Sequence, residues 1–97
     1  MINVIRDDDV VMDIISKFKP EIKQQIYSAL DKNKNDIYIP AKTTTGKCTL
    51  LIKCAEDENS GLIYIFSDTI EELLYCIEDT DIKEQDKKAI KSYFDMH

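Results

Sequence analysis

The side chains able to catalyse reactions near neutral pH are scarce in this chain. Histidine is the usual proton carrier in that range, and the single histidine, His97, is the last residue, where chain ends commonly fray. Without an interior histidine, no Ser-His or Cys-His pair can activate a nucleophile, and no glycine-rich elbow surrounds a serine. Two carboxylates could share acid and base roles only in unlike environments, which sequence spacing does not reveal. We therefore expect no catalytic residues and no enzyme.

One short stretch resembles a phosphate-binding P-loop. From Ala41 to Cys48 the sequence reads AKTTTGKC, with glycine and lysine in the expected order. It departs from the motif at both ends, since Ala41 replaces the first glycine and Cys48 replaces the serine or threonine that binds the metal. An alternating strand pattern follows, whereas phosphate binding requires a helix N-terminus. We interpret residues Thr43 to Gly46 as a hairpin turn.

The three cysteines do not have the spacing of a disulfide or a metal site. Cys48 and Cys54 fall on the same face of a predicted strand, about 20 Å apart at the rise of a strand, which is too far for either. Cys76 flanks the apolar stripe of a predicted helix, so all three are interpreted as small core residues. The acid-rich turn at residues 56–58 lacks the ligand spacing and the glycine of a calcium loop. We expect no metal and no other cofactor, and the odd number of cysteines favours a reducing compartment.

The acidic residues are concentrated in one segment, from Cys54 to Asp81. This segment carries nine acids and no lysine or arginine. Residues 1–53 hold nine basic and seven acidic side chains, and residues 82–97 hold four and three. The net charge of −6 is therefore a charge of −9 on the segment, partly offset by slightly basic flanks. Such a charge argues against direct binding to a nucleic-acid backbone and favours basic proteins as partners. The nine acids are Glu56, Asp57, Glu58, Asp68, Glu71, Glu72, Glu78, Asp79 and Asp81.

The acidic segment also contains the most apolar run of the chain, Leu62 to Phe66, followed at once by a helix start. Asp68 and Glu71 have the spacing of a capping box. An inward stripe is then predicted at helical spacing, formed by Ile70, Leu73, Leu74 and Ile77. The residues left for the outward face of this helix are Asp68, Glu71, Glu72, Tyr75, Glu78 and Asp79.

Two helices are predicted ahead of the strands. The acids Asp7, Asp8 and Asp9 favour a helix N-terminus, because negative charge complements the helix dipole there. Pro20 separates this helix from a second one that runs to about Lys32. Residues 2–5 fit either a short strand or a lead into the first helix. The apolar faces are Val10 or Val11, Ile14, Ile15 and Phe18 in the first helix, and Ile22, Ile26, Ala29 and Leu30 in the second.

Three strands and a last helix complete the elements. Residues 37–42 alternate as a strand, which Pro40 places at a sheet edge because proline cannot donate a ladder hydrogen bond. Residues 47–54 alternate between apolar and partly polar positions and predict a half-exposed strand. The run 62–66 is apolar on both faces, so we expect it to be covered on both. Asp81 and Glu84 have capping-box spacing for the last helix, whose predicted apolar face is Ile82, Ala89, Ile90, Tyr93 and Phe94.

These elements predict an α+β fold with residues 1–97 as one domain. It has two N-terminal helices, a three-stranded, mainly antiparallel sheet with a possible extra N-terminal strand, and two C-terminal helices. Strand order and oligomeric state stay open. No apolar run approaches the roughly 18 residues of a membrane span, and Asp7 to Asp9 stand where a secretory signal needs basic and then apolar residues. We expect a cytoplasmic protein that does not contact a membrane.

The acids of the segment are predicted to form one patch. If the helix after Asp68 runs back along the sheet, its far end returns near the turn at residues 56–58. Tyr75 would then be the aromatic anchor of a binding surface. The alternative is a solvated face that only keeps the protein soluble. The predicted partner-binding residues are Glu56, Asp57, Glu58, Asp68, Glu71, Glu72, Tyr75, Glu78, Asp79 and Asp81.

The preferred hypothesis is a small inhibitory protein of the kind that immunity proteins and antitoxins exemplify. Size, charge and compactness match that type, although no family motif does. Such a protein would cover the basic active site of a nuclease-like toxin and block it by occlusion, without chemistry. The alternative is a phage-type protein that mimics nucleic acid and inhibits a host defence enzyme with rows of carboxylates. A carboxylate or metal-dependent enzyme is a third class, which requires a deep pocket lined by two acids with divergent pKa values.

Overall fold

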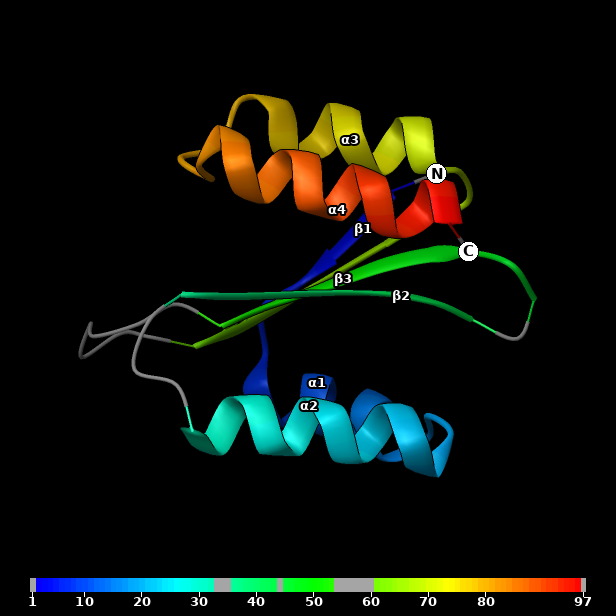
Figure 1. Cartoon of the computed structure of the whole chain (residues 1–97). Helices are drawn as coiled ribbons and strands as arrows, with labels where there is room; N and C mark the ends of the chain where they lie inside the picture. The colour runs from blue at the N-terminus through cyan, green and yellow to red at the C-terminus, as the bar shows by residue number, and fades with distance from the viewer. Residues whose placement is uncertain (1, 33–35, 44, 54–60, 97) are drawn as a thin grey trace.

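The computed structural model describes residues 2–32, 36–43, 45–53 and 61–96. Within them, a four-stranded sheet lies between two pairs of helices, α1 and α2 on one face and α3 and α4 on the other (Figure 1). This arrangement confirms the predicted α+β class and the predicted order of elements, with one strand added at the N-terminus. In chain order the elements are β1 (Ile2–Ile5), α1 (Asp8–Ser16), α2 (Pro20–Lys32), β2 (Ile37–Lys42), β3 (Cys48–Lys53), β4 (Leu62–Ser67), α3 (Ile70–Glu78) and α4 (Glu84–Met96).

The strands are ordered β1-β4-β3-β2, and all neighbours are antiparallel. Residues 2–5, left open by the sequence, form β1, in which Ile2 lies opposite Ser67 and Ile5 opposite Tyr64. The strand with Pro40 is at an edge, as predicted. β4 lies inside the sheet with helices on both faces, so its apolar run is covered on both sides in the middle, at Tyr64 and Ile65, whereas Phe66 is only half-buried.

The prediction of a half-exposed β3 is wrong. Every residue from Cys48 to Ile52 is buried. Thr49, at a position predicted to face solvent, is buried. Its hydroxyl is satisfied, because Oγ1 donates to the carbonyl oxygen of Ala41 on β2 at 3.0 Å. A polar side chain can be buried when its hydroxyl is hydrogen-bonded. The two alternating sets of side chains in β3 therefore face the two faces of the sheet, both of which are covered, instead of one core and solvent.

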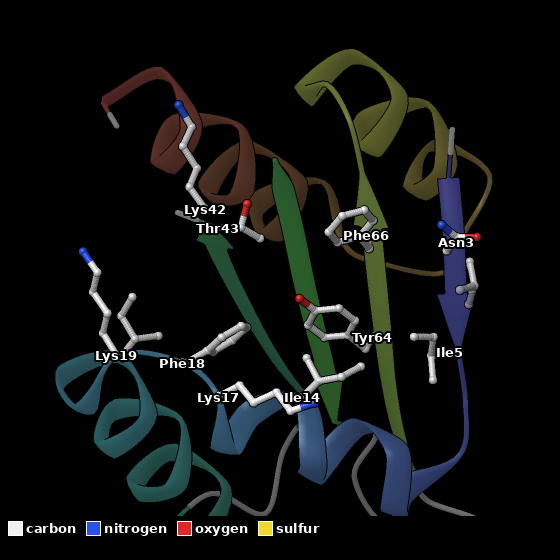
Figure 2. A pocket seen from close by; sticks show the side chains of 12 residues that line it. Asn3, Ile5, Ile14, Lys17, Phe18, Lys19, Lys42, Thr43, Tyr64 and Phe66 are labelled. Carbon is white, nitrogen blue, oxygen red and sulfur yellow. The ribbon is translucent and has the colours of Figure 1, made fainter. Parts of the chain in front are cut away.

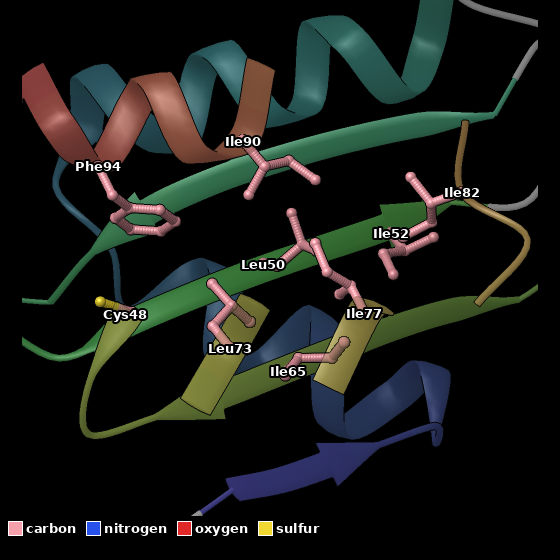
Figure 3. Close-up of a cluster of buried hydrophobic side chains, with 9 residues drawn as sticks. All are labelled: Cys48, Leu50, Ile52, Ile65, Leu73, Ile77, Ile82, Ile90 and Phe94. Carbon is pink, nitrogen blue, oxygen red and sulfur yellow. The ribbon is translucent and has the colours of Figure 1, made fainter. Parts of the chain in front are cut away.

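Two hydrophobic cores lie on the two faces of the sheet. The C-terminal core, under α3 and α4, contains Leu50 of β3, Ile65 of β4, and Leu73, Ile77, Ile90 and Phe94 of the helices (Figure 3). The N-terminal core, under α1 and α2, is formed by Val11, Ile15, Ile26, Leu51 and Tyr64. The predicted helix stripes supply both cores, except that Ala89 of α4 is exposed. Ala89 is wrong as a core residue because the buried line of α4 runs through Ile90 and Phe94, and Ala89 lies beside it.

The starts of α3 and α4 differ from the predictions, whereas α1 begins at the predicted acids. At α1, Asp7 is the N-cap, and its Oδ1 accepts from the amides of Asp9 at 3.0 Å and Val10 at 3.3 Å. At α3 the cap is Thr69, whose Oγ1 accepts from the Glu72 amide at 3.2 Å, so the capping box lies one residue later than predicted.

The last helix also begins later than predicted. α4 starts at Glu84, and the first turn closes through the Lys87 amide on the carbonyl oxygen of Lys83 at 3.0 Å. Asp81 therefore stands ahead of the helix and is not its cap. The link between α3 and α4 is instead held by Thr80, whose Oγ1 donates to the carbonyl oxygen of Ile77 at 2.6 Å and accepts from the Ile82 amide at 3.4 Å.

The stretch that resembles a P-loop is a hairpin turn, as interpreted from the sequence. The Thr43 amide donates to the Lys47 carbonyl oxygen at 2.9 Å, and the Gly46 amide donates to the Thr43 carbonyl oxygen at 3.0 Å. Gly46 has a φ of 83°, in the left-handed region that glycine adopts without strain.

Candidate functional site

The outward face of α3 carries the most exposed aromatic side chain of the described chain. Leu73 and Ile77 turn into the C-terminal core, which leaves Tyr75 on the opposite side with 76% of its surface exposed. Glu71 lies four residues before Tyr75 and Glu78 three residues after it, so both carboxylates are its neighbours on the helix surface. Asp79 follows at the next position of the same face. We call Glu71, Tyr75, Glu78 and Asp79 the α3 face.

The acids of the α3 face are unneutralised. Glu71, Glu78 and Asp79 are all exposed, and their carboxylates make no ion pair with any residue that the structure describes. No basic side chain lies in the last turn of α3. The C-terminus of a helix carries a partial negative charge, so Glu78 and Asp79 add to the negative potential there.

Asp68 does not belong to this face. Its Oδ1 accepts a hydrogen bond from the Lys47 ammonium at 2.7 Å, and this contact is the largest of the causes that lower the pKa of Asp68 to about 2. The same ammonium lies 5.4 Å from the centre of the Phe66 ring. A lysine from the first half of the chain therefore compensates the charge of Asp68.

The remaining predicted site residues are placed in different ways. Glu72 is half-buried at the start of α3, where Thr69 Oγ1 donates to its Oε1 at 3.4 Å. Asp81 is exposed in the link after α3, two residues beyond Asp79. Residues Glu56, Asp57 and Glu58 lie outside the described residues. The structure thus brings together Glu71, Tyr75, Glu78 and Asp79, with Asp81 next in the chain, and separates Asp68 from them. Glu72 lies three residues before Tyr75 on α3 but is half-buried.

Three lysines of α4 border the α3 face, and sequence reasoning missed this. A groove of about 540 Å³ runs between α3 and α4, with Glu71, Tyr75 and Glu78 among its lining residues on one side. On the other side it is lined by Lys87, Lys88 and Lys91. Helical spacing alone places these lysines on the solvated face of their own helix. The signal that could have revealed them is the short link at residues 79–83, since helices joined by few residues pack side by side.

Only one of these lysines is tied to α3. The Lys87 ammonium donates to the carbonyl oxygen of Glu78 at 2.8 Å and lies 3.6 Å from Glu84 Oε1, and only 17% of the Lys87 side chain is exposed. It satisfies a terminal carbonyl of α3 and offsets part of the negative charge at that end. Lys88 and Lys91 are exposed and make no ion pair within the described ranges. The acidic surface therefore ends along α4.

The described residues offer little for chemistry. No group of three or more histidine, cysteine or acidic residues among them is placed to hold a metal ion. Cys48 is buried, and this burial raises the pKa of its thiol, which disfavours the reactive thiolate. Cys76 is half-buried, as expected for a residue at the flank of the α3 stripe, and Cys54 lies outside the described residues. None of the described helices combines the length and the apolar character that crossing a membrane would require.

No protein-family model matches this chain, and no curated protein or solved structure matches it either.

Proposed function

We propose that this protein binds a basic protein partner through the α3 face and inhibits it by covering its surface. The closest functional type is an immunity protein or antitoxin that neutralises a nuclease-like toxin. The observation that carries the proposal is an exposed tyrosine flanked by carboxylates that the described chain leaves unpaired. Tyrosine is among the residues that contribute most to binding energy in protein interfaces, particularly at the centre of a patch.

The placement of Asp79 supports a role beyond solubility. It is the C-cap of α3, at the negative end of the helix dipole, where a cation would stabilise the helix and an anion destabilises it. An acid that opposes stability is expected where the charge serves another purpose. Solubility alone could be obtained from carboxylates at positions that cost the fold nothing.

The charge of the α3 face also fits occlusion of a basic site. Complementary fields accelerate the encounter of two proteins, and the exposed acids on α3 would steer it toward a cation-rich surface. Nucleic-acid mimicry requires a long, phosphate-like row of acids. Among the residues that the structure describes, the row on α3 is short and is bordered by Lys88 and Lys91, so we favour the toxin-inhibitor type.

Affinity capture from a lysate of the native host tests the proposal, with the captured protein identified by mass spectrometry. The wild type is compared with Glu71→Lys/Glu78→Lys, which leaves Glu72 in the capping box. The control is Asp9→Lys/Glu21→Lys, which changes the net charge equally at exposed positions on α1 and α2, across the sheet. We expect the wild type and the control to retain a basic protein at low salt, and the α3 variant to lose it.

The captured protein is then assayed for its own activity. If it is a nuclease toxin, adding the wild-type inhibitor should abolish cleavage. A captured host defence enzyme would instead favour mimicry. Equal capture by all three variants would contradict the assignment of the α3 face.

A further inference from the structure

A second candidate site lies across the sheet from the α3 face. There α1 and α2 cover only one end of the sheet, and the ends of β2 and β4 and the start of β1 extend beyond them (Figure 2). The uncovered end forms a groove of about 630 Å³. Small-molecule sites usually have volumes of about 300–1,000 Å³, so the groove is large enough for one organic ligand.

The bottom of this groove is apolar and largely aromatic. Tyr64 and Phe66 of β4 line it, together with Phe18 at the end of α1 and Ile5 of β1. The rings of Phe18 and Tyr64 lie 6.3 Å apart and tilted at 45°. Tyr64 is only 3% exposed, but Ile5, Phe18 and Phe66 are half-buried at the edge of the N-terminal core. This end of the N-terminal core is therefore open to solvent, which is typical of a binding groove.

The rim of the groove is basic. Its lining includes Lys17, Lys19 and Lys42 and no acid, in a protein whose net charge is −6. Lys17 pairs with Asp13 at 3.2 Å on the exposed surface of α1. Lys19 and Lys42 are exposed and have no ion-pair partner in the part of the chain that the structure describes. Figure 2 shows both amino groups on the side of the groove away from Ile5 and directed away from Tyr64 and Phe66, that of Lys19 outward at the α1–α2 corner and that of Lys42 past the end of β2.

We propose that this groove binds a small amphipathic organic anion. The apolar body of the ligand lies over Tyr64 and Phe66, and its carboxylate or similar head group lies at the edge of the groove, where the long, exposed side chains of Lys19 and Lys42 turn toward it. Apolar contacts supply the affinity, and the two ammonium groups select a negatively charged head over a neutral one. The site is separate from the α3 face, so the proposal does not depend on the proposed inhibitory function.

Sodium decanoate is a suitable probe because it joins a flexible apolar chain to one carboxylate. The full chain is titrated with decanoate, with decanol and with acetate, below the concentration at which decanoate forms micelles. Isothermal titration calorimetry measures affinity and stoichiometry, and amide chemical shifts in a ¹⁵N-labelled sample locate the site. We expect one decanoate per chain, with shifts at Ile5, Phe18, Lys42 and Phe66, weaker binding of decanol, and no binding of acetate.

The lysines are tested with Lys19→Gln/Lys42→Gln, which changes exposed side chains and leaves the core intact. This variant should bind decanoate roughly 5-fold more weakly and decanol as before, since each exposed charge contact contributes about 0.2–1 kcal/mol. The control is Lys88→Gln/Lys91→Gln on α4, across the sheet, which should bind decanoate like the wild type.

Three results would overturn the proposal. One is the absence of saturable decanoate binding, and another is equal affinity for decanoate and decanol. The third is a set of shifts that map to α3 and α4, since this would place the ligand in the groove beside the α3 face. A protein partner seated on the groove would appear as competition between that partner and decanoate.

Discussion

Tyr75 is the residue on which the proposed interface depends most. It is 76% exposed and contributes almost nothing to the C-terminal core, so its ring is available to a partner. Exposed side chains away from caps and cores usually change stability by no more than about 0.5 kcal/mol when replaced. An anchor at the centre of an interface loses about 2 kcal/mol or more of binding energy on truncation. The two effects can therefore be separated in one variant.

We predict that Tyr75→Ala weakens binding to the captured partner by roughly 30-fold and leaves the free energy of unfolding unchanged within about 0.5 kcal/mol. Surface plasmon resonance and urea denaturation measure the two quantities. Tyr27→Ala, at a tyrosine on α2 that is 38% exposed, is the control and should keep full affinity. A Tyr75→Ala protein that binds like the wild type would remove the anchor from the proposal.

A second residue-scale prediction concerns Asp68 and Lys47. Their hydrogen bond is the largest of the causes that lower the pKa of Asp68 from 3.8 to about 2. A carboxyl group whose pKa is lower in the folded state binds protons more readily when unfolded, so its stabilising contribution is complete above the unfolded-state pKa. The contribution is lost as pH falls through the folded-state pKa.

We therefore expect Asp68→Asn to be less stable than the wild type at pH 7, and the difference to shrink as pH falls from about 4 to about 2. Urea denaturation midpoints at several pH values measure this. Lys47→Gln should produce a smaller pH-dependent difference of the same sign, because it removes the largest of the causes that lower the pKa of Asp68 and leaves the others. A difference between wild type and Asp68→Asn that is constant over this pH range would show that the ion pair is not its source.

At the scale of elements, helix α3 combines a structural and a functional requirement. Its inward stripe and its Thr69 cap serve the fold, whereas its C-terminal acids oppose the helix dipole. We predict that Asp79→Lys raises the free energy of unfolding by about 0.3–1 kcal/mol and slows association with the basic partner several-fold. Denaturation and stopped-flow kinetics measure the two changes. Higher stability with an unchanged association rate would indicate that Asp79 is only a solvated residue.

The elements themselves were largely predictable, and the errors have physical causes. Residues 68–72 read DTIEE, so Asp68 with Glu71 and Thr69 with Glu72 both satisfy the capping-box spacing. In the structure Lys47, 21 residues away, donates a hydrogen bond to Asp68, and Thr69 caps the helix instead. Burial of Thr49 likewise depends on a carbonyl group of the neighbouring strand. Such errors arise where a tertiary contact decides between local patterns that fit equally well.

The candidate site was predictable only in part. Helical spacing placed Glu71, Tyr75 and Glu78 on one outward face, because that follows from the period of an α-helix. Which surface lies next to that face depends on how α4 packs, and the sequence does not show that Lys88 and Lys91 border it. The aromatic groove was missed for the same reason, since Phe18 and Phe66 come from elements far apart in the chain.

At the scale of the whole molecule, charge is divided between the two layers of helices. The α3 face is acidic, the opposite groove is rimmed by Lys19 and Lys42, and Lys88 and Lys91 stand at the border of the acidic surface. A basic partner that approaches α3 meets attraction from the α3 face and repulsion from these two α4 lysines. The attraction of a basic partner therefore depends on which face of the molecule it approaches, which the net charge of −6 alone does not show.

We predict that Lys88→Glu/Lys91→Glu accelerates association with the basic partner by about 3- to 10-fold at low ionic strength, with little change in the dissociation rate. The gain should disappear at high salt, because screening shortens the range of the field. The control, Lys19→Glu/Lys23→Glu, changes the net charge equally at α2 and the residue before it, on the other side of the sheet, and should have a much smaller effect. Equal acceleration by both variants would mean that only total charge matters, and that the partner does not dock specifically on α3.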